Sequence, residues 1–402
     1  MNTDGRILVL HFANEPVRAG AEEHMLMLLT RLDRSRFHPM LAAPPELIAM
    51  LRPDLPTDLK VFPISLRSWR DAAAAWRFAR MLAARRVDIL HSHMFQAGKF
   101  ASPLGWLARV PVVIETSHGP EGWRRGWLKG SYFVDRLLAR FVTGFIAVSE
   151  STGRYLRTEK RLPAGKIVVI RNGTTLERFE PGHAAPPALR QSFGIAQQAP
   201  VVLVLARLEP PKGHTVLLDA WQSITTSFPD ARLVCLGDGK LRAELEAKAA
   251  ALGISTSVLF PGYQSNVPDW LALADFTVLP SCYEGLPLAA IESLAAGRAV
   301  VGTVVGGTTE VVLDGKTGLT VPAGQPAPLA AAICRLLASP GWARNLGRLG
   351  RRFVEEHYSA QRQVAETESF YLRCYRRSSR MAAGSSAAAS AANANALQEK
   401  SL

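Results

Sequence analysis

The chain has 402 residues, of which 48% are hydrophobic and 20% charged, and its formal net charge at pH 7 is +13. At about 150 residues per domain, this length predicts two or three domains of globular composition. Collagen-like, fully disordered and small disulfide-scaffold proteins are excluded. The positive charge indicates an anionic partner such as a nucleotide, a nucleic acid or an anionic lipid, although a genomic preference for Arg would also contribute.

Short apolar runs alternate with amphipathic segments along the first half of the chain. Helices are predicted between most of the runs, for instance at Ala21–Leu32 and Asp71–Arg85. Such alternation indicates right-handed crossovers and a parallel sheet. The predicted strands are Ile7–Phe12, Pro39–Ala43, Lys60–Ile64, Val87–His91, Pro111–Thr116, Gly144–Val148 and Lys166–Ile170.

The alternation restarts after residues 171–200, a Pro-rich segment of linker composition. Helices are predicted at Thr215–Ser227, Leu241–Leu252 and Pro287–Ala296. The second set of strands is Val201–Ala206, Arg232–Leu236, Ser257–Phe260, Phe276–Leu279 and Ala299–Thr303.

These patterns predict an α/β fold of two doubly wound, Rossmann-like domains that face a central cleft. The first domain would comprise residues 1–175 and the second residues 176–354, and a late amphipathic helix is predicted at Ser359–Arg377. Residues 378–402 are Ala/Ser/Asn-rich and are predicted to be a disordered tail. Because open α/β sheets bind ligands at the carboxyl ends of their strands, functional residues are expected in the loops that follow strands.

The densest cluster of such residues follows the predicted strand Phe276–Leu279 and opens a helix. Glu284 and Glu292 are eight residues apart and are expected to line one pocket, although two solvated acids would show the same spacing. The backbone N–H groups of Gly285, Leu286 and Leu288 are placed to bind an anion at the positive end of the helix.

Three further clusters follow predicted strands. Arg207 and Lys212 stand five residues apart on a Pro-stiffened loop, a pattern that suits a diphosphate but that two surface cations would also show. His118 follows Pro111–Thr116, and a structural histidine is the alternative there; His91 and His93 are weaker candidates. Gly20, in the turn after the first strand, permits close approach to a phosphate or sugar.

Several signatures are missing from the sequence. It contains no Asp-x-Asp for a metal-bound nucleotide diphosphate, no P-loop, no Gly-x-Ser-x-Gly hydrolase elbow and no Cys-x-x-Cys. The four cysteines stand at least forty residues apart, which fits a reducing compartment. Without a signal-peptide pattern or an apolar run of about 18 residues, a cytoplasmic location is expected, with peripheral attachment to the inner face of the plasma membrane as a second expectation.

Taken together, these clusters resemble the retaining nucleotide-sugar glycosyltransferases of the GT-B architecture, family 4. Glu284-Gly-Leu-Pro-Leu…Glu292 is similar to the family's Glu-x7-Glu motif, and Ala206-Arg-Leu…Lys212-Gly213 to its Gly-Arg-Leu…Lys-Gly loop. Ile170-Arg-Asn-Gly-Thr-Thr resembles the interdomain Pro-Asn-Gly-Val-Asp segment.

The resemblance implies that the late helix, near 355–377, crosses back onto the first domain, and it implies a role for each candidate residue. Arg207 and Lys212 would hold the donor diphosphate, Glu284 would hydrogen-bond the transferred sugar, and Glu292 would bind the ribose. His118 would contact the sugar near the reacting carbon. The remaining residues would approach the sugar and phosphates through their backbone: Gly20, Gly285, Leu286 and Leu288.

A basic, aromatic segment suggests a membrane partner. Its apolar positions at helical spacing are Trp123, Trp127, Val134, Leu138 and Phe141, and its cations are Arg125, Lys129, Arg136 and Arg140. This pattern is typical of an interfacial helix on anionic lipid, and equally of a core-packing helix with a solvated basic face.

The sequence as a whole predicts a metal-independent retaining glycosyltransferase without a cofactor. Its donor would be a nucleotide sugar, and its acceptor a saccharide or lipid-linked saccharide in polysaccharide or glycolipid assembly. A nucleotide-sugar 2-epimerase and a non-catalytic nucleotide-sugar sensor are the alternatives. A nucleic-acid-binding protein is disfavoured, because no helix-turn-helix, zinc or aromatic-strand signature is present.

Overall fold

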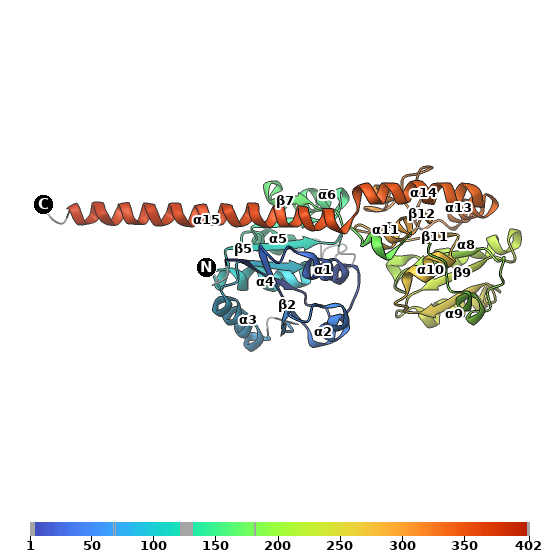
Figure 1. Cartoon of the computed structure of the whole chain (residues 1–402), viewed down its shortest axis with the longest axis horizontal. Helices are drawn as coiled ribbons and strands as arrows, with labels where there is room; N and C mark the ends of the chain where they lie inside the picture. The colour runs from blue at the N-terminus through green and yellow to red at the C-terminus, as the bar shows by residue number, and fades with distance from the viewer. Residues whose placement is uncertain (1–4, 67, 69, 121–131, 181, 400–402) are drawn as a thin grey trace.

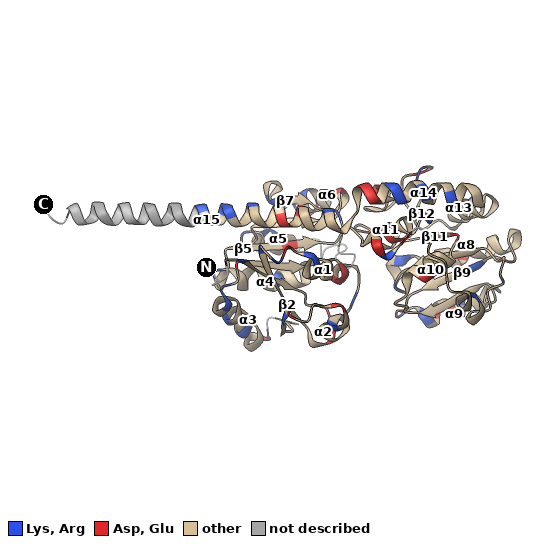
Figure 2. Ribbon diagram, viewed as in Figure 1, with Lys and Arg blue, Asp and Glu red and all other residues tan. Residues whose placement is uncertain are grey.

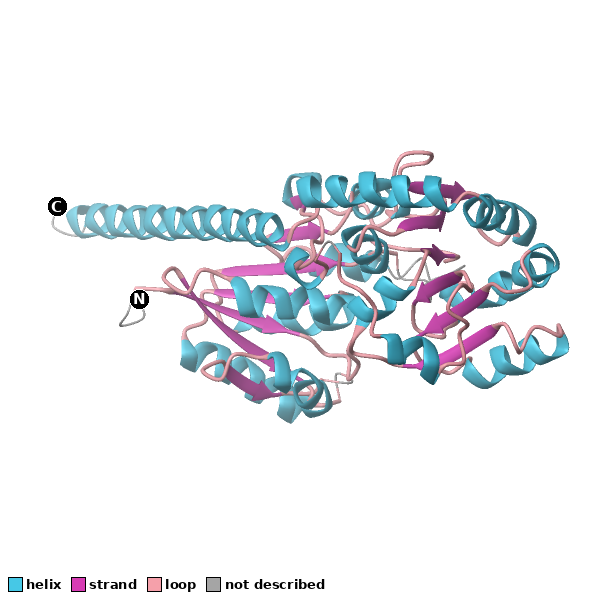
Figure 3. Cartoon of the chain, turned by 45° about the vertical axis from the view of Figure 1, so that its right-hand side comes forward, coloured by secondary structure: helices cyan, strands magenta, loops and turns pink. Residues whose placement is uncertain are grey.

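The computed structural model describes residues 5–66, 68, 70–120, 132–180 and 182–399, with side chains described as far as Arg380. Two parallel sheets lie side by side, each covered by helices on both faces (Figures 1 and 3). This arrangement confirms the predicted pair of doubly wound domains. Of the helices that the structure describes, none combines the length and the apolarity needed to cross a membrane.

The first sheet has seven parallel strands in the order β3-β2-β1-β4-β5-β6-β7. The strands are β1 (Ile7–Phe12), β2 (Phe37–Ala43), β3 (Lys60–Pro63), β4 (Ile89–His93), β5 (Val112–Ser117), β6 (Gly144–Ala147) and β7 (Ile167–Val169). The helices around them are α1 (Gly20–Arg31), α2 (Pro45–Leu51), α3 (Ala72–Arg85), α4 (Phe95–Leu107), α5 (Tyr132–Leu138) and α6 (Glu150–Thr158).

The second sheet has six parallel strands in the order β10-β9-β8-β11-β12-β13. The strands are β8 (Val201–Leu205), β9 (Arg232–Leu236), β10 (Val258–Gly262), β11 (Phe276–Leu279), β12 (Ala299–Thr303) and β13 (Gly318–Val321). The helices are α7 (Pro187–Ser192), α8 (His214–Ser227), α9 (Arg242–Ala251), α10 (Val267–Leu273), α11 (Leu288–Ala295), α12 (Thr308–Val311), α13 (Pro326–Ala338) and α14 (Pro340–His357).

The central strands are apolar along their whole length because both of their faces are covered. In β8, Val202 and Val204 face one core cluster while Val201 and Leu203 face the other. Continuous apolar runs are typical of parallel strands buried on both faces. The strand order reverses between β8 and β11, so a crevice forms at their carboxyl ends, where open α/β sheets bind ligands.

The chain crosses between the domains twice, and the two crossings are hydrogen-bonded to each other. The Thr174 N–H donates to the Tyr358 carbonyl at 2.8 Å, and the Ala360 N–H donates to the Thr174 carbonyl at 2.9 Å. The long helix α15 (Ala360–Glu399) then runs along the first domain (Figure 1). Its Phe370 and Tyr371 complete a core cluster that contains residues of β1, β4 and β5, so the expected crossing helix is confirmed.

A carboxylate also joins the domains. Glu310 of α12 accepts hydrogen bonds from the backbone N–H groups of Glu150 and Ser151, at 3.0 and 2.9 Å, in the first turn of α6. An acid at a helix N-terminus is stabilised by the helix dipole. Arg171, in the first crossing, lies within ion-pair distance of both Glu310 and Glu150.

The structure differs from the sequence-based predictions in three places. The tail predicted to be disordered continues α15 as helix to Glu399, because alanine has the highest helix propensity and extending a formed helix needs no new nucleus. Strand β4, predicted at Val87–His91, begins and ends two residues later than predicted, so it also includes His93. Strand β13 was not predicted. The domain boundary after residue 175 stays a prediction.

Of the predicted amphipathic helix, Trp123, Arg125, Trp127 and Lys129 lie outside the described residues. The rest of the segment forms α5 and the turn after it, and Val134 on α5 is exposed.

Candidate functional site

A cavity of about 250 Å³ lies between the domains at the carboxyl ends of β8 and β11. Eight of the nine residues proposed from the sequence line it, namely Gly20, His118, Arg207, Lys212, Glu284, Gly285, Leu286 and Leu288. The first two come from the first domain and the others from the second. Loops that follow strands of both sheets therefore converge on one site.

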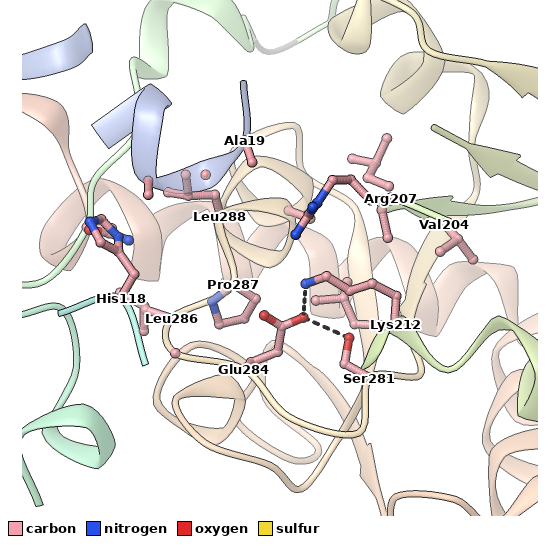
Figure 4. Close-up of a pocket in the computed structure, with 18 of the residues that line it drawn as sticks. Ala19, His118, Val204, Arg207, Lys212, Ser281, Glu284, Leu286, Pro287 and Leu288 are labelled. Atoms are coloured by element: carbon pink, nitrogen blue, oxygen red, sulfur yellow. Dashed lines mark hydrogen bonds and ion pairs between the residues drawn. The ribbon is translucent and has the colours of Figure 1, made fainter. Parts of the chain in front are cut away.

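The centre of the cavity wall is an ion pair between Lys212 and Glu284. The Lys212 Nζ lies 2.6 Å from Glu284 Oε1, and the Ser281 hydroxyl donates to the same oxygen at 2.7 Å (Figure 4). Pro210 and Pro211 open the short 3₁₀ turn that positions Lys212. The two charged side chains are 26% and 11% exposed, so solvent screens this pair only in part.

Arg207 adds a second cation to the same wall. Its side chain points into the cavity beside Lys212 (Figure 4), and one guanidinium nitrogen donates to Glu209 at 2.9 Å. Since its side chain is 48% exposed, it keeps donors free for an anionic ligand. The two cations suit a diphosphate.

Helix α11 begins at Leu288 on the cavity wall. No side chain of the described residues caps its first turn, so the N–H groups there and the positive end of the helix dipole face the site. On the opposite wall, the position that a Cβ on Gly20 would occupy is 3.5 Å from Leu288. The first domain thus approaches this helix end closely.

The two domains touch through the backbones of two glycine-containing loops. A Cβ on Gly285 would overlap the His118 carbonyl oxygen. Gly119 has a φ of +132°, and a Cβ there would lie 2.8 Å from the Gly285 Cα. Larger residues at either position would push the loops apart, which explains why glycine stands at both.

His118, which is half-buried on the cavity wall, contacts a cluster of four buried histidines, His11, His24, His91 and His93, that extends into the first domain. Burial lowers the pKa of His118 far below its ordinary value and that of His24 to about 4, so both rings are neutral at pH 7. The His118 Nε2 has no hydrogen-bond partner among the described residues. His11 and His24 were not predicted from the sequence, because their grouping with the other histidines depends on how β1 and α1 pack against β4.

Three of these histidines are close enough to share a metal ion. Potential ligand atoms of His11, His91 and His93 lie within 4.8 Å of one another. Both ring nitrogens of His91 already have partners, however, in the Tyr371 and Thr116 hydroxyls at 2.5 and 2.6 Å. The three rings lie behind the cavity, and none of them lines it.

Glu292 lines a separate cavity of about 220 Å³, which shares Leu288 with the first. The structure therefore places Glu284 and Glu292 on two adjoining cavities, and their contact with one ligand stays a prediction. Glu292 lies a full turn into α11, where the helix directs it towards α1 and the first crossing. Burial raises the pKa of Glu292 to about 7, and Arg178 opposes that shift.

Comparison with known proteins agrees with this architecture. Residues 18–178 match the model of Glycosyltransferase Family 4, and residues 187–353 match that of Glycosyl transferases group 1. A D-inositol 3-phosphate glycosyltransferase of Thermobispora bispora is 30% identical over 335 residues, which cover 72% of this chain and 75% of that protein.

Two solved structures share the fold at low sequence identity. HepE of Anabaena, solved in complex with UDP and glucose, has a TM-score of 0.79 and 20% identity over 90% of this chain and all of that one. WaaG, a glycosyltransferase involved in lipopolysaccharide biosynthesis, has a TM-score of 0.70 and 15% identity over 89% of this chain and 98% of that one.

The fold and the interdomain site define a two-domain glycosyltransferase of the GT-B architecture. The chain belongs to glycosyltransferase family 4, the glycosyl transferases group 1.

The contact at Gly285 predicts that Gly285→Ala opens the cleft, because its methyl group would overlap the His118 carbonyl. We expect a larger radius of gyration in small-angle X-ray scattering and a turnover lowered about 10²-fold by the misplaced loop. Gly341→Ala is the control, since a Cβ there meets no neighbour. Unchanged scattering and turnover in Gly285→Ala would contradict the close contact.

The raised pKa of Glu292 predicts a pH-dependent contribution to stability. Because the folded value of about 7 exceeds the ordinary 4.5, the folded chain binds this proton more tightly. The stabilisation is therefore complete below about pH 4.5 and is lost as the pH rises through about 7. As the pH rises from about 5 to about 8, the thermal midpoint of Glu292→Gln should increase relative to that of the wild type. Glu244→Gln, on the exposed face of α9, should show no such trend, and a pH-independent difference for Glu292→Gln would count against the assignment.

Proposed function

We propose that this enzyme is a retaining, metal-independent glycosyltransferase that moves a sugar from a nucleoside-diphosphate donor to a saccharide or lipid-linked saccharide. Its product would enter cell-surface polysaccharide or glycolipid assembly. The observation that carries the proposal is the convergence of Arg207, Lys212 and the uncapped start of α11 on one interdomain cavity. Fixed cations and amide dipoles of this kind stabilise a diphosphate.

The chemistry follows from where negative charge develops. When the bond between the sugar and the diphosphate breaks, charge accumulates on the leaving phosphate and the sugar becomes cation-like. Preorganised donors aimed at that charge lower the barrier, and here they take the place of a divalent ion. Lys212 has three N–H donors, so it binds Glu284 with one and keeps the others for a phosphate oxygen.

The sugar would lie between the two domains. Glu284, fixed by Lys212 and Ser281, would accept hydrogen bonds from its hydroxyl groups. The unpartnered Nε2 of the neutral His118 is available to a hydroxyl near the reacting carbon. Closure of the domains around the donor would exclude water and limit hydrolysis.

The nucleoside would occupy the second cavity. Glu292 lines that cavity beside Arg178 and Thr174 and would bind the ribose hydroxyls. The two cavities share Leu288, so one donor molecule would span both, with its diphosphate at the start of α11.

Features of known relatives and of the chain support the donor, the pathway and the location. HepE binds UDP and glucose, and WaaG acts in lipopolysaccharide biosynthesis, as their structures are described. By analogy, we assign a nucleotide-sugar donor and a surface-glycan product. The free thiols of Cys235, Cys282, Cys334 and Cys374 fit a cytoplasmic location.

Charge removal in the cavity predicts a large loss of rate. Arg207→Ala and Glu284→Gln should each lower turnover about 10²–10³-fold, equivalent to about 2.7–4 kcal/mol of transition-state stabilisation. The thermal midpoint should change little, since both side chains lie at the cavity surface. Arg352→Ala and Glu244→Gln, both exposed in the second domain, are the matched controls. Full turnover in both cavity variants would refute the site.

The function itself is tested by a thermal-shift screen of UDP- and GDP-sugars. The best donor is then incubated with lipid-extract acceptors, and the products are identified by mass spectrometry. Transfer that persists in a chelator supports the proposal. Conversion of the donor without an acceptor would indicate an epimerase, and loss of activity in the chelator would contradict metal independence.

A further inference from the structure

A third cavity, larger than the two at the cleft, lies in the first domain at the amino ends of β5 and β7. This is the sheet edge opposite the interdomain cleft. Its volume is about 1100 Å³. One wall is a single face of α15 that carries Phe370, Arg373, Cys374 and Arg377. The other walls are Pro111 before β5, the turn of residues 140–143 after α5, and the turn before β7. We call this cavity the basal groove.

The basal groove is strongly basic. Arg140, Lys166, Arg373 and Arg377 line it, and none of its described lining residues is Asp or Glu. Lys166 donates to the backbone carbonyls of Ala139 and Val142, at 2.9 and 2.6 Å. Burial and the neighbouring Arg377 lower the pKa of Lys166. Cations thus face one another in the groove without a counterion.

Two of the arginines on α15, Arg373 and Arg377, are free to bind a ligand. Among the described residues, no carboxylate lies within ion-pair distance of Arg373 or Arg377. The guanidinium of Arg373 lies over the Phe370 ring, 5.6 Å from its centre, so it is held against the apolar floor of the groove. Figure 2 shows basic residues gathered on α15 just before its undescribed side chains.

Exposed apolar side chains adjoin the groove. Trp106 and Leu107, at the end of α4, are 62% and 59% exposed. The Trp106 ring contacts that of Phe141 at 5.3 Å between centres, and Phe141 lines the groove. The apolar side chains and the cations therefore form one continuous surface.

We propose that the basal groove and its apolar rim bind the surface of an anionic membrane, with a phospholipid phosphate in the groove. The unpaired cations would bind the phosphate, while Trp106 and Leu107 enter the boundary between headgroups and acyl chains. Exposed aromatic and aliphatic side chains beside free cations are typical of an interfacial surface. A small soluble phosphate would use the cations and leave the apolar rim in water.

This surface extends towards the cleft. Helix α5 connects the carboxyl edge of the first sheet, where β5 ends, to the amino edge, where the groove lies. Exposed Phe133, Val134 and Leu137 lie on this helix between the two sites. A membrane on this side of the domain would therefore cover both the groove and the flank that leads to the cleft.

The test is co-sedimentation of the full chain with phosphatidylglycerol–phosphatidylcholine vesicles and with pure phosphatidylcholine vesicles. We expect binding to the anionic vesicles that weakens as salt rises. Arg373→Gln combined with Arg377→Gln should lower the partition coefficient about 30-fold, since two cations near the surface are lost. Arg348→Gln combined with Arg352→Gln, on α14 of the second domain, removes the same charge and should leave binding unchanged.

A second variant tests the apolar rim. Trp106→Ser combined with Leu107→Ser should weaken binding to anionic vesicles while retaining its salt dependence. Circular dichroism and the thermal midpoint verify that each variant is folded.

Several results would overturn the proposal. These are equal binding to phosphatidylcholine, an equal loss in the α14 control, and wild-type binding by the α15 variant. If the wild type bound millimolar glycerol phosphate, the α15 variant did not, and neither bound vesicles, the groove would be a soluble phosphate site instead. An oligonucleotide that binds more tightly than the vesicles, with the same dependence on Arg373 and Arg377, would identify a nucleic-acid site.

Discussion

The close approach of two loop backbones is the constraint on which the site depends. The loop at Gly119 in the first domain and the loop at Gly285 in the second meet without intervening side chains. A third loop supports them, since the Gly307 N–H donates to the Gly285 carbonyl at 3.0 Å. Glu284 and the start of α11 are therefore held by backbone packing, and small residues at this contact keep the cavity walls from both domains within reach of one ligand.

The electrostatics of the cleft complement this geometry. Lys212 and Glu284 neutralise each other, while burial raises the pKa of Glu22 and of Glu292 to about 7. The buried histidines are neutral because desolvation disfavours their charged forms. Most of the polar groups around the cleft are thus uncharged or paired. Arg207 pairs with Glu209 through one nitrogen and keeps other donors beside the positive end of the helix dipole, so an anion is the ligand for which the site is prepared.

Much of the fold was predictable from the sequence because parallel strands buried on both faces leave a local signal. The predicted bounds of β1, β9, β11 and β12 agree with the structure. The loops that line the cavity followed from the rule that ligands bind at the carboxyl ends of strands.

What the sequence did not reveal depends on contacts between distant segments. His93 was expected after the strand, but β4 contains it, and the buried imidazoles of His91 and His93 have polar partners on neighbouring elements: the Tyr371 hydroxyl on α15, the Thr116 hydroxyl on β5 and the His11 ring on β1. The separation of Glu292 from Glu284 depends on how α11 meets α1 and the first crossing. Local periodicity carries no information about such packing.

The position of α15 has a consequence for how the protein is made. One core cluster of the first domain needs Val364, Phe370 and Tyr371, which are translated after the whole of the second domain. While the ribosome is still elongating, that apolar face is uncovered, and the amino-terminal domain cannot reach its final packing. The second domain can finish folding first, which inverts the usual order of co-translational folding. Nascent chains stalled before residue 360 should therefore be the species that most needs chaperone protection.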